Sequence, residues 1–353
     1  MISRSTLFST RGGDTVQIEE TAKAIKLKGY AVEVFTANQY VPYERFDLIH
    51  FFNIIRPNTI IPHIKNCNKP FVVSTIFVDY REVELNYRGW LGRVTLKLLG
   101  KNSLEYLKII ARKVKNGEPI LDLGYLFRGH KKSIEYILNR AEFVLPNSDS
   151  ELKRLQKEYK LTSKTKIIPN AVNNCFIQDI YKEKKEIVLC VARIEPIKNQ
   201  LNLIRALRNT DIKLKLIGKA APNHTSYFKQ CIKEATENVE FLGELTREEV
   251  IEELKQAKVH VLPSWFETTG LSSLEAGAMG CNVVVTKKGD TQEYFKNLVE
   301  YAEPDNVVSI KEAIEKALSN ELNNKLQDEI RLNYRWEITA EKTIEAYLKS
   351  TKE

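Results

Sequence analysis

The sequence predicts an α/β protein with two doubly wound parallel sheets, one in each half of the chain. Its 353 residues are too many for one ordinary domain and sufficient for two, each with its own core. Short apolar, β-branched runs alternate with helical patterns through both halves. Strands that alternate with helices form parallel sheets, because each helix returns the chain to the same edge. We therefore expect two such domains facing across a cleft lined by the carboxyl ends of their strands.

Four strands are expected in the first half, with helices between them. A helical pattern covers residues 15–28, follows the pair Gly12-Gly13 and ends at Gly29. A second helix is expected over residues 151–160, where the polar run 147–151 can cap its start. The runs that predict the strands cover residues 31–36, 48–52, 71–76 and 143–146.

The second half repeats this alternation. Its predicted strands cover residues 186–192, 214–218, 239–242, 259–263 and 282–286. Its helices are expected at about residues 199–208, 226–236, 247–257, 270–279 and 290–296. Thr246 and Glu249 form a capping box at the start of one of them. The boundary falls around residues 169–185, which gives a first domain over residues 1–172 and a second over residues 173–335.

Basic residues are concentrated in the first half. Residues 1–172 carry 28 Lys and Arg against 17 Asp and Glu, whereas residues 173–353 carry 26 against 29. The segment 86–116 holds eight basic side chains and one acid, interleaved with apolar residues. This composition suits contact with an anionic membrane surface. A solvated helix face packed on its own domain is an equally good interpretation.

Several classes of protein are disfavoured by what the sequence lacks. Its five cysteines are odd in number and widely scattered, which suits neither a disulfide framework nor a zinc site. No apolar stretch reaches the roughly 20 residues that span a bilayer, and the N-terminus lacks the layout of a signal peptide. No recognisable nucleic-acid-binding module is present. We expect a cytoplasmic protein, free or held at the inner face of the membrane.

The run Glu267-Thr-Thr-Gly-Leu-Ser-Ser-Leu-Glu275 follows a strand that ends near Pro263. A helix is expected to open near Gly270, so its unpaired backbone N–H groups can bind a diphosphate. Glu267 lies at the edge of this site and Glu275 farther along the helix. One carboxylate can meet a sugar while the other accepts hydrogen bonds from ribose hydroxyls.

Two cations follow another predicted strand of the second half. Arg193 ends that strand, and Lys198 starts the next helix. Both can reach the same edge of the sheet, where fixed positive charge stabilises a departing diphosphate without a metal ion. Taken singly, they are more often ordinary strand-end and helix-start residues. The sequence contains no Asp-x-Asp pair, a common magnesium anchor.

Together these features resemble the large retaining glycosyltransferase family of the GT-B fold, commonly called family 4 (glycosyl transferases group 1), over nearly the whole chain. The matching motifs are Glu267-x7-Glu275, Glu-Ala-x-Ala-x-Gly at 275–280, Arg193-x4-Lys198-Asn199, Val239-Glu-Phe-Leu-Gly243, the Gly12-Gly13 loop and the pattern around Trp336. The resemblance implies two Rossmann-like domains and a C-terminal helix, residues 336–353, that crosses back to the first domain.

The resemblance also implies a role for each matching residue. Arg193 and Lys198 would bind the donor diphosphate, and Glu267 would face the transferred sugar. Glu275 would bind the ribose. The remaining donor contacts would come from the amides of Thr269, Gly270 and Leu271, and from the loop at Gly12 and Gly13. Transfer would retain the anomeric configuration, with no metal, no other cofactor and no enzyme nucleophile.

Two positions depart from the family pattern. Thr269 stands where many relatives carry an aromatic residue. Phe77 stands in place of a histidine that usually contacts the donor sugar, which makes nearby Asp79 a weak candidate for that contact. His50, at the end of a predicted strand, is another weak candidate; a satisfied core histidine is at least as good an interpretation.

The leading prediction is a hexosyltransferase of EC class 2.4. It would move a hexose or N-acetylhexosamine from a UDP- or GDP-sugar to a glycan acceptor, lipid-linked in cell-surface polysaccharide or lipopolysaccharide assembly. The basic first half motivates the lipid-linked acceptor. The alternatives are a sugar-nucleotide 2-epimerase of the same fold and a catalytically silent glycosyltransferase-like binding subunit.

Overall fold

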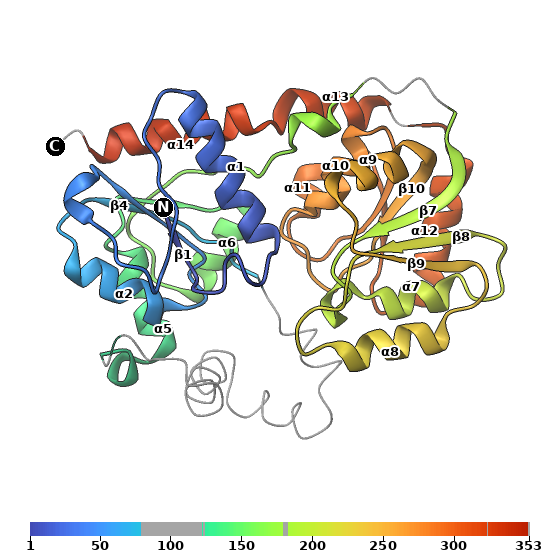
Figure 1. Cartoon of the computed structure of the whole chain (residues 1–353), viewed down its shortest axis with the longest axis horizontal. Helices are drawn as coiled ribbons and strands as arrows, with labels where there is room; N and C mark the ends of the chain where they lie inside the picture. The colour runs from blue at the N-terminus through green and yellow to red at the C-terminus, as the bar shows by residue number, and fades with distance from the viewer. Residues whose placement is uncertain (79–121, 123, 179–182, 323, 352–353) are drawn as a thin grey trace. The chain divides into compact units, whose positions relative to one another are not determined.

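The computed structural model describes residues 1–78, 122, 124–178, 183–322 and 324–351, and in them the chain forms two compact units. The first unit takes in Met1–Phe77, the described residues from 122 to 169, and the C-terminal stretch from Trp336. The second unit contains Asn170–Arg335. Each unit holds a parallel sheet of six strands with flanking helices (Figure 1), which confirms the predicted α/β fold class.

The first sheet has the strand order β2-β1-β3-β4-β5-β6. Its strands are β1 (Ile2–Ser3), β2 (Phe35–Thr36), β3 (Ile49–Phe52), β4 (Phe71–Ser74), β5 (Phe143–Leu145) and β6 (Lys164–Thr165). The described helices of this unit are α1 (Gly13–Leu27), α2 (Pro57–Asn66), α5 (Gly124–Leu138), α6 (Asp149–Glu158) and α14 (Trp336–Ser350).

The first half departs from prediction mainly at its sheet edge. The strand expected over residues 31–36 shortens to β2, because its only neighbour, β1, offers two residues for pairing. Helix α6 begins earlier than expected, since Ser148 is its N-cap and accepts a hydrogen bond from Glu151 N at 3.0 Å. Helix α2 was not predicted: Pro62 in its interior argues against a helix, although Pro57 suits the first helical position.

The second sheet has the order β12-β11-β10-β7-β8-β9. Its strands are β7 (Lys185–Val191), β8 (Lys213–Ile217), β9 (Val239–Gly243), β10 (Ala257–Leu262), β11 (Asn282–Thr286) and β12 (Glu300–Ala302). Its helices are α7 (Gln200–Ala206), α8 (Thr225–Glu234), α9 (Arg247–Gln256), α10 (Leu271–Ala278), α11 (Thr291–Phe295), α12 (Val307–Ser319) and α13 (Asn324–Asn333). Every strand and helix predicted for this half is present, and the Thr246–Glu249 capping box is formed.

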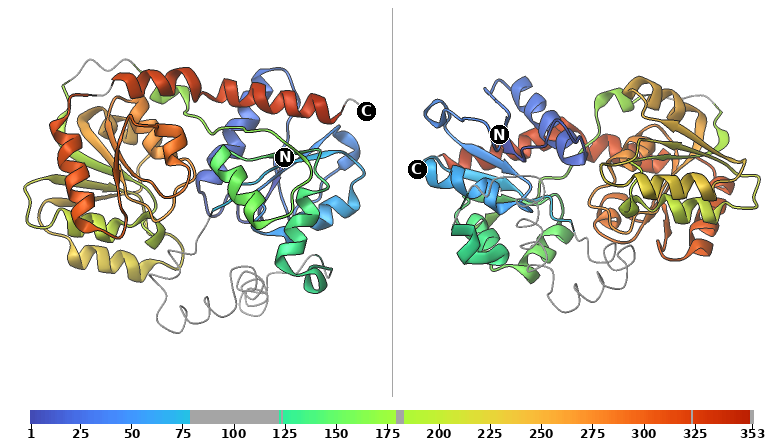
Figure 2. Two further views of the ribbon diagram at one scale, coloured as in Figure 1. Left: turned by 180° about the vertical axis from the view of Figure 1, so that it is seen from behind. Right: turned by 60° about the horizontal axis from the view of Figure 1, so that its bottom comes forward.

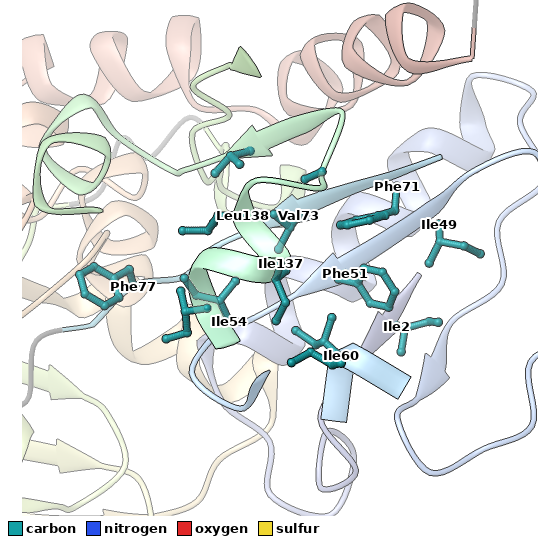
Figure 3. Packing of buried hydrophobic residues seen from close by; sticks show 14 of the residues in the cluster. Ile2, Ile49, Phe51, Ile54, Ile60, Phe71, Val73, Phe77, Ile137 and Leu138 are labelled. Atoms are coloured by element: carbon teal, nitrogen blue, oxygen red, sulfur yellow. The ribbon is translucent and has the colours of Figure 1, made fainter. Parts of the chain in front are cut away.

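The main core of the first unit lies between its sheet and helices α2 and α5. Phe51 of β3 and Phe71 of β4 meet edge to face, with ring centroids 5.4 Å apart (Figure 3). Ile60 of α2 and Ile137 of α5 belong to the same buried cluster. This apolar layer fixes the strands, and with them the loops that leave their carboxyl ends.

Helix α14 packs within the first unit against α1 and β4 (Figure 2). His50 of β3 takes part in this packing: Nδ1 shares a hydrogen bond of 2.6 Å with Tyr347 Oη, and Nε2 shares one of 2.9 Å with Ser74 Oγ. Burial lowers the pKa of His50 well below its usual range, so the ring is neutral. His50 is therefore a satisfied core residue that anchors α14, the second of the two interpretations that the sequence left open.

His260 of β10 is a buried polar group in the core of the second unit. It is 0% exposed, and in the described part of the chain neither ring nitrogen has a hydrogen-bond partner. Burial lowers the pKa of His260 from 6.5 to about 3. The folded state therefore keeps the ring neutral at a pH where the unfolded chain binds a proton.

This difference predicts that acid destabilises the second unit through His260. The stabilising contribution is complete above pH 6.5 and is lost as the pH falls towards 3, by about 1.4 kcal/mol per pH unit. Urea denaturation of the wild type and of His260→Leu between pH 7.5 and 4 tests this. The wild type should lose stability more steeply than the variant; parallel curves would contradict the prediction.

Candidate functional site

Glu267 lies in the connection between β10 and α10, and its backbone is fixed by the loop that follows β11. Its N–H donates to Lys288 O at 3.0 Å, and its carbonyl accepts from Asp290 N at 2.9 Å. Between these two bonds, Gly289 pairs with Glu267 in an isolated parallel bridge. Loops after two neighbouring strands therefore hold this residue at the carboxyl end of the second sheet.

The Glu267 side chain forms an ion pair with Lys198. Lys198 Nζ lies 2.7 Å from Glu267 Oε2, and Ser264 Oγ donates to the same oxygen at 3.1 Å. The Glu267 side chain is 10% exposed and that of Lys198 22%, so water screens the pair only in part. Lys198 and Glu267, which lie far apart in the sequence, thus form one polar group together with Ser264.

Backbone contacts bring the Lys198 segment to this position. Residues Pro196–Lys198 form a short 3-10 turn after β7, and Ile197 O accepts a hydrogen bond from Trp265 N at 2.9 Å. Asn199 follows in the left-handed region, and its amide donates to Pro263 O at 3.0 Å. Each contact joins the Lys198 segment to the loop that carries Glu267.

Arg193 lies at the same end of β7 but makes a different ion pair. Its NH2 group lies 2.9 Å from Glu195 Oε1, and its side chain is 38% exposed. Gln200 Nε2 donates to the Arg193 carbonyl at 2.9 Å. Among the described contacts, no ion pair or hydrogen bond joins Arg193 to Lys198 or Glu267, so only Lys198 and Glu267 of these three are directly paired.

Helix α10 begins where the sequence predicted it, with Gly270 as its N-cap. Gly270 has φ 73°, a left-handed conformation that favours glycine. Leu271 is the first helical residue, and Glu275 lies half-buried in the second turn. Thr269 is 1% exposed, and its hydroxyl accepts a hydrogen bond from Asn170 Nδ2 at 2.9 Å. The N–H groups of the first turn can bind an anion at this end of the helix.

The glycine candidates of the first unit lie at the start of helix α1. Gly12 is the N-cap of α1, Gly13 is the first residue of that helix, and Gly12 N donates to Thr15 Oγ1 at 3.2 Å. Asp79 and the basic segment 86–116 lie outside the described residues, so their predicted roles stay predictions.

Phe77 belongs to the core of the first unit. It is 3% exposed and belongs to the buried cluster drawn in Figure 3. It packs edge to face against Tyr159, with ring centroids 5.7 Å apart. Its backbone N–H donates to the buried Glu151 carboxylate at 2.7 Å. Phe77 therefore has a structural role in the core, and none of these contacts points to a donor sugar.

Several residues of the group were missed by sequence reasoning, namely Ser264, Gly289, Asp290 and Asn170. Ser264 follows the strand-ending Pro263 directly, and this position could have suggested it. Gly289 and Asp290 reach Glu267 from the next strand, a contact that depends on strand order. Asn170 lies about 100 residues from Thr269, a separation that no local pattern spans.

The described residues contain neither a candidate membrane-spanning helix nor a candidate metal site. None of the described helices combines the length and apolar character needed to cross a membrane. No group of three or more His, Cys, Asp or Glu side chains in the described ranges is arranged to hold a metal ion.

Part of the second unit matches a known family of proteins. Residues 176–335 match the family model described as glycosyl transferases group 1. No curated protein matches the chain.

Similar solved structures cover almost the whole chain. Sucrose-phosphate synthase from Thermosynechococcus elongatus superposes with a TM-score of 0.73 at 16% identity, over 96% of this chain and 93% of that one. Anabaena HepE, in complex with UDP and glucose, superposes with a TM-score of 0.68 at 15% identity, over 98% of this chain and 99% of that one.

A third similar structure is larger than this chain. It is a G117R mutant of TarM from S. aureus, in complex with fondaparinux, alpha-GlcNAc-glycerol and UDP. Its TM-score is 0.60 at 18% identity, over 84% of this chain and 55% of that one. The chain thus has the fold of the GT-B glycosyltransferases, and its segment 176–335 matches the group 1 glycosyl transferases.

Proposed function

We infer that the chain is a metal-independent, retaining hexosyltransferase of family 4. It moves a hexose or N-acetylhexosamine from a UDP- or GDP-sugar to a glycan acceptor. The observation that carries this proposal is the Lys198–Glu267 ion pair, 2.7 Å long, in the loops that precede α7 and α10. The match of residues 176–335 to group 1 glycosyl transferases supports the same reaction class.

The charges of the group suit departure of a nucleoside diphosphate. Cleavage of the glycosyl–phosphate bond places negative charge on the phosphate oxygen, and Lys198 and Arg193 can neutralise it. The N–H groups of Thr269, Gly270 and Leu271 add positive potential at the start of α10. Because fixed protein groups supply this charge, turnover should persist in EDTA.

The two glutamates act on different parts of the donor. Glu267, held by Ser264 and Lys198, faces the transferred sugar and stabilises the positive charge that develops at its reacting carbon. Glu275, in the second turn of α10, accepts hydrogen bonds from the ribose hydroxyls. The acceptor oxygen bonds to the reacting carbon on the face from which the phosphate leaves, so the configuration is retained, and the departing phosphate oxygen takes the acceptor proton.

The acceptor is a glycan that we assign to the first unit and take to be lipid-linked. The excess of basic residues over residues 1–172 motivates this assignment, since anionic lipid attracts such a surface. HepE and TarM, which share the fold, were solved with sugar or glycan ligands beside UDP.

Nucleotide binding is the direct test of the proposal. Thermal unfolding with UDP, GDP and their common sugars should show stabilisation by one nucleotide series, about 2.7 kcal/mol at 100 times the Kd. Glu275→Ala should weaken that affinity by about 1.5–3 kcal/mol, because hydrogen bonds to a charged group are lost. Glu312→Ala, an exposed carboxylate on α12, is the matched control and should bind normally.

The products separate the proposal from its alternatives. Mass spectrometry should detect a glycoside together with free nucleoside diphosphate. Release of an epimerised free sugar would identify a 2-epimerase instead. Binding without turnover for any acceptor would indicate a silent binding subunit, and no stabilisation by any nucleotide would refute the proposal.

A further inference from the structure

The loop between β1 and α1 lies at the point where the first sheet changes direction. Strand β2 follows β1 in the chain and pairs with one side of it, whereas β3 pairs with the other side. In open parallel sheets, ligands bind beside the carboxyl ends of the strands at such a reversal of strand order. Residues 4–12 lead from the carboxyl end of β1 to α1, so they lie where a ligand of the first unit is expected.

Arg4 holds this loop in one conformation. Its Nε and Nη2 donate to the two carboxylate oxygens of Asp14, in the first turn of α1, at 2.6 and 2.9 Å. Nη1 donates to Thr6 O at 2.7 Å and to Thr6 Oγ1 at 2.8 Å, and Nη2 also donates to Thr10 O at 2.7 Å. A guanidinium has five N–H groups, so each of them is used within the same loop and the helix that follows it.

Further contacts anchor the loop to the sheet. Leu7 is fully buried in a cluster that includes Phe52 of β3, and its carbonyl accepts a hydrogen bond from Thr15 Oγ1 at 2.9 Å. Asn53, which follows β3 in the left-handed region at φ 70°, makes a side-chain hydrogen bond to Asp14. The loop is therefore shaped by the fold itself, before any ligand binds.

Phe8 is exposed on the outer side of this fixed loop. Its side chain is 48% exposed, and the side chains exposed with it in the loop are those of Ser5, Ser9 and Arg11. The Arg11 guanidinium is already paired with both oxygens of Glu19, at 3.0 and 2.5 Å. A membrane or a protein partner needs a contiguous apolar area of several hundred Å², which one phenyl ring among hydroxyl groups does not provide.

The chemistry of these side chains fits a sugar ring. A pyranose presents a face of C–H bonds surrounded by hydroxyl groups. The C–H face packs on an aromatic ring, whose partial negative charge attracts the polarised hydrogens. The hydroxyls of Ser5 and Ser9 can donate to the sugar hydroxyls or accept from them. A phosphate group gains nothing from the phenyl ring, and the exposed cation beside it, Arg11, is neutralised by Glu19.

We propose that Phe8 stacks on a sugar ring of the acceptor glycan. This inference rests on the proposed function, which assigns the acceptor to the first unit without naming a residue that touches it. Arg4 acts as a positioning residue, because its hydrogen bonds hold the loop that carries Phe8. The ring is in place before the glycan arrives, so binding orders little of the loop.

Substitutions of Phe8 test this site, with the methyl α- and β-glycosides of glucose, galactose, mannose and N-acetylglucosamine as probes. Saturation-transfer NMR gives the affinity for each glycoside, and calorimetry gives the affinities for UDP, GDP and their sugars. Phe8→Ala should weaken binding of the preferred glycoside roughly tenfold and leave the nucleotide affinities unchanged. Phe8→Tyr keeps the ring and should bind like the wild type. Phe8→Leu keeps the apolar bulk without the ring and should lose as much affinity as Phe8→Ala.

Tyr30→Ala is the matched control. Tyr30 is 41% exposed, close to the value for Phe8, but it precedes β2 and so lies towards the amino ends of the strands. Its removal should change neither the glycoside nor the nucleotide affinities. Melting temperatures of all variants separate a loss of folding from a loss of binding, and Phe8→Leu remains informative if Phe8→Ala folds poorly.

The remaining outcomes separate this inference from the proposed function. Unchanged glycoside affinity in Phe8→Ala would overturn the stacking site, and so would wild-type affinity in Phe8→Leu. A loss of nucleotide-sugar affinity would place Phe8 at the donor, and a wild type that binds none of the glycosides would also refute the site. Each of these results leaves nucleotide binding intact. A wild type that binds no nucleotide or nucleotide sugar would instead refute the proposed function, and with it the role of the glycoside as an acceptor.

Discussion

Lys198→Met should lower turnover by roughly 10²–10³, the usual effect of removing one preorganised group that stabilises developing charge. Lys198 Nζ lies 2.7 Å from Glu267 Oε2, so the substitution removes the cation and leaves a largely buried carboxylate without its ion pair. Both effects act on the same step, since the cation faces the departing phosphate and the carboxylate faces the sugar. The measurement is kcat for donor consumption at saturating acceptor.

Lys215→Met is the matched control. Lys215 also lies 2.7 Å from its partner, Glu253, and both side chains are about one fifth exposed. Its loss removes an ion pair of the same length from the same unit, without touching the group around Glu267. A stability change common to both variants therefore reports the lost ion pair. Near-normal turnover in Lys198→Met would contradict the assigned role of Lys198.

The second half was more predictable than the first, for a physical reason. Its strands are long, buried runs such as Asn282–Thr286, and its helices carry clear caps, as at Thr246. The first sheet relies on two-residue strands such as Ile2–Ser3, which have no periodicity to detect. Their existence depends on pairing with distant strands, because two isolated residues gain too little to order themselves.

The candidate site was predictable where it follows motif spacing. From sequence, Lys198 was placed at the start of a helix and Glu267 in the run after a strand, and the structure brings the two together. The hydrogen bonds of Arg4 that fix the loop of Phe8 could not be predicted, since they depend on the path of that loop in the folded chain. The core roles of His50 and Phe77 likewise depend on contacts with Tyr347 and Glu151, which lie far away in the chain.

Gly289→Ala should damage stability and turnover together, because Gly289 supports Glu267. Its φ of 104° is strained for any side chain, and an added Cβ would lie 2.0 Å from Glu267 O and 2.8 Å from Glu267 C. Both obstacles are backbone atoms, so one of the two loops must move. We expect a loss of unfolding free energy of about 2–4 kcal/mol, the sum of overpacking and backbone strain.

The displacement should reach the chemistry through the backbone of Glu267. A misplacement of about 1 Å costs about 10²-fold in rate, so turnover should fall at least that far even at temperatures where the variant is folded. Gly280→Ala is the matched control: its φ is 73°, but the nearest atoms to its Cβ would lie at 3.7 and 3.8 Å and belong to flexible side chains. It should lose about 1 kcal/mol of stability and keep its turnover. Equal effects in the two variants would show that strain at glycine alone is responsible, and that the close approach of Gly289 does not position Glu267.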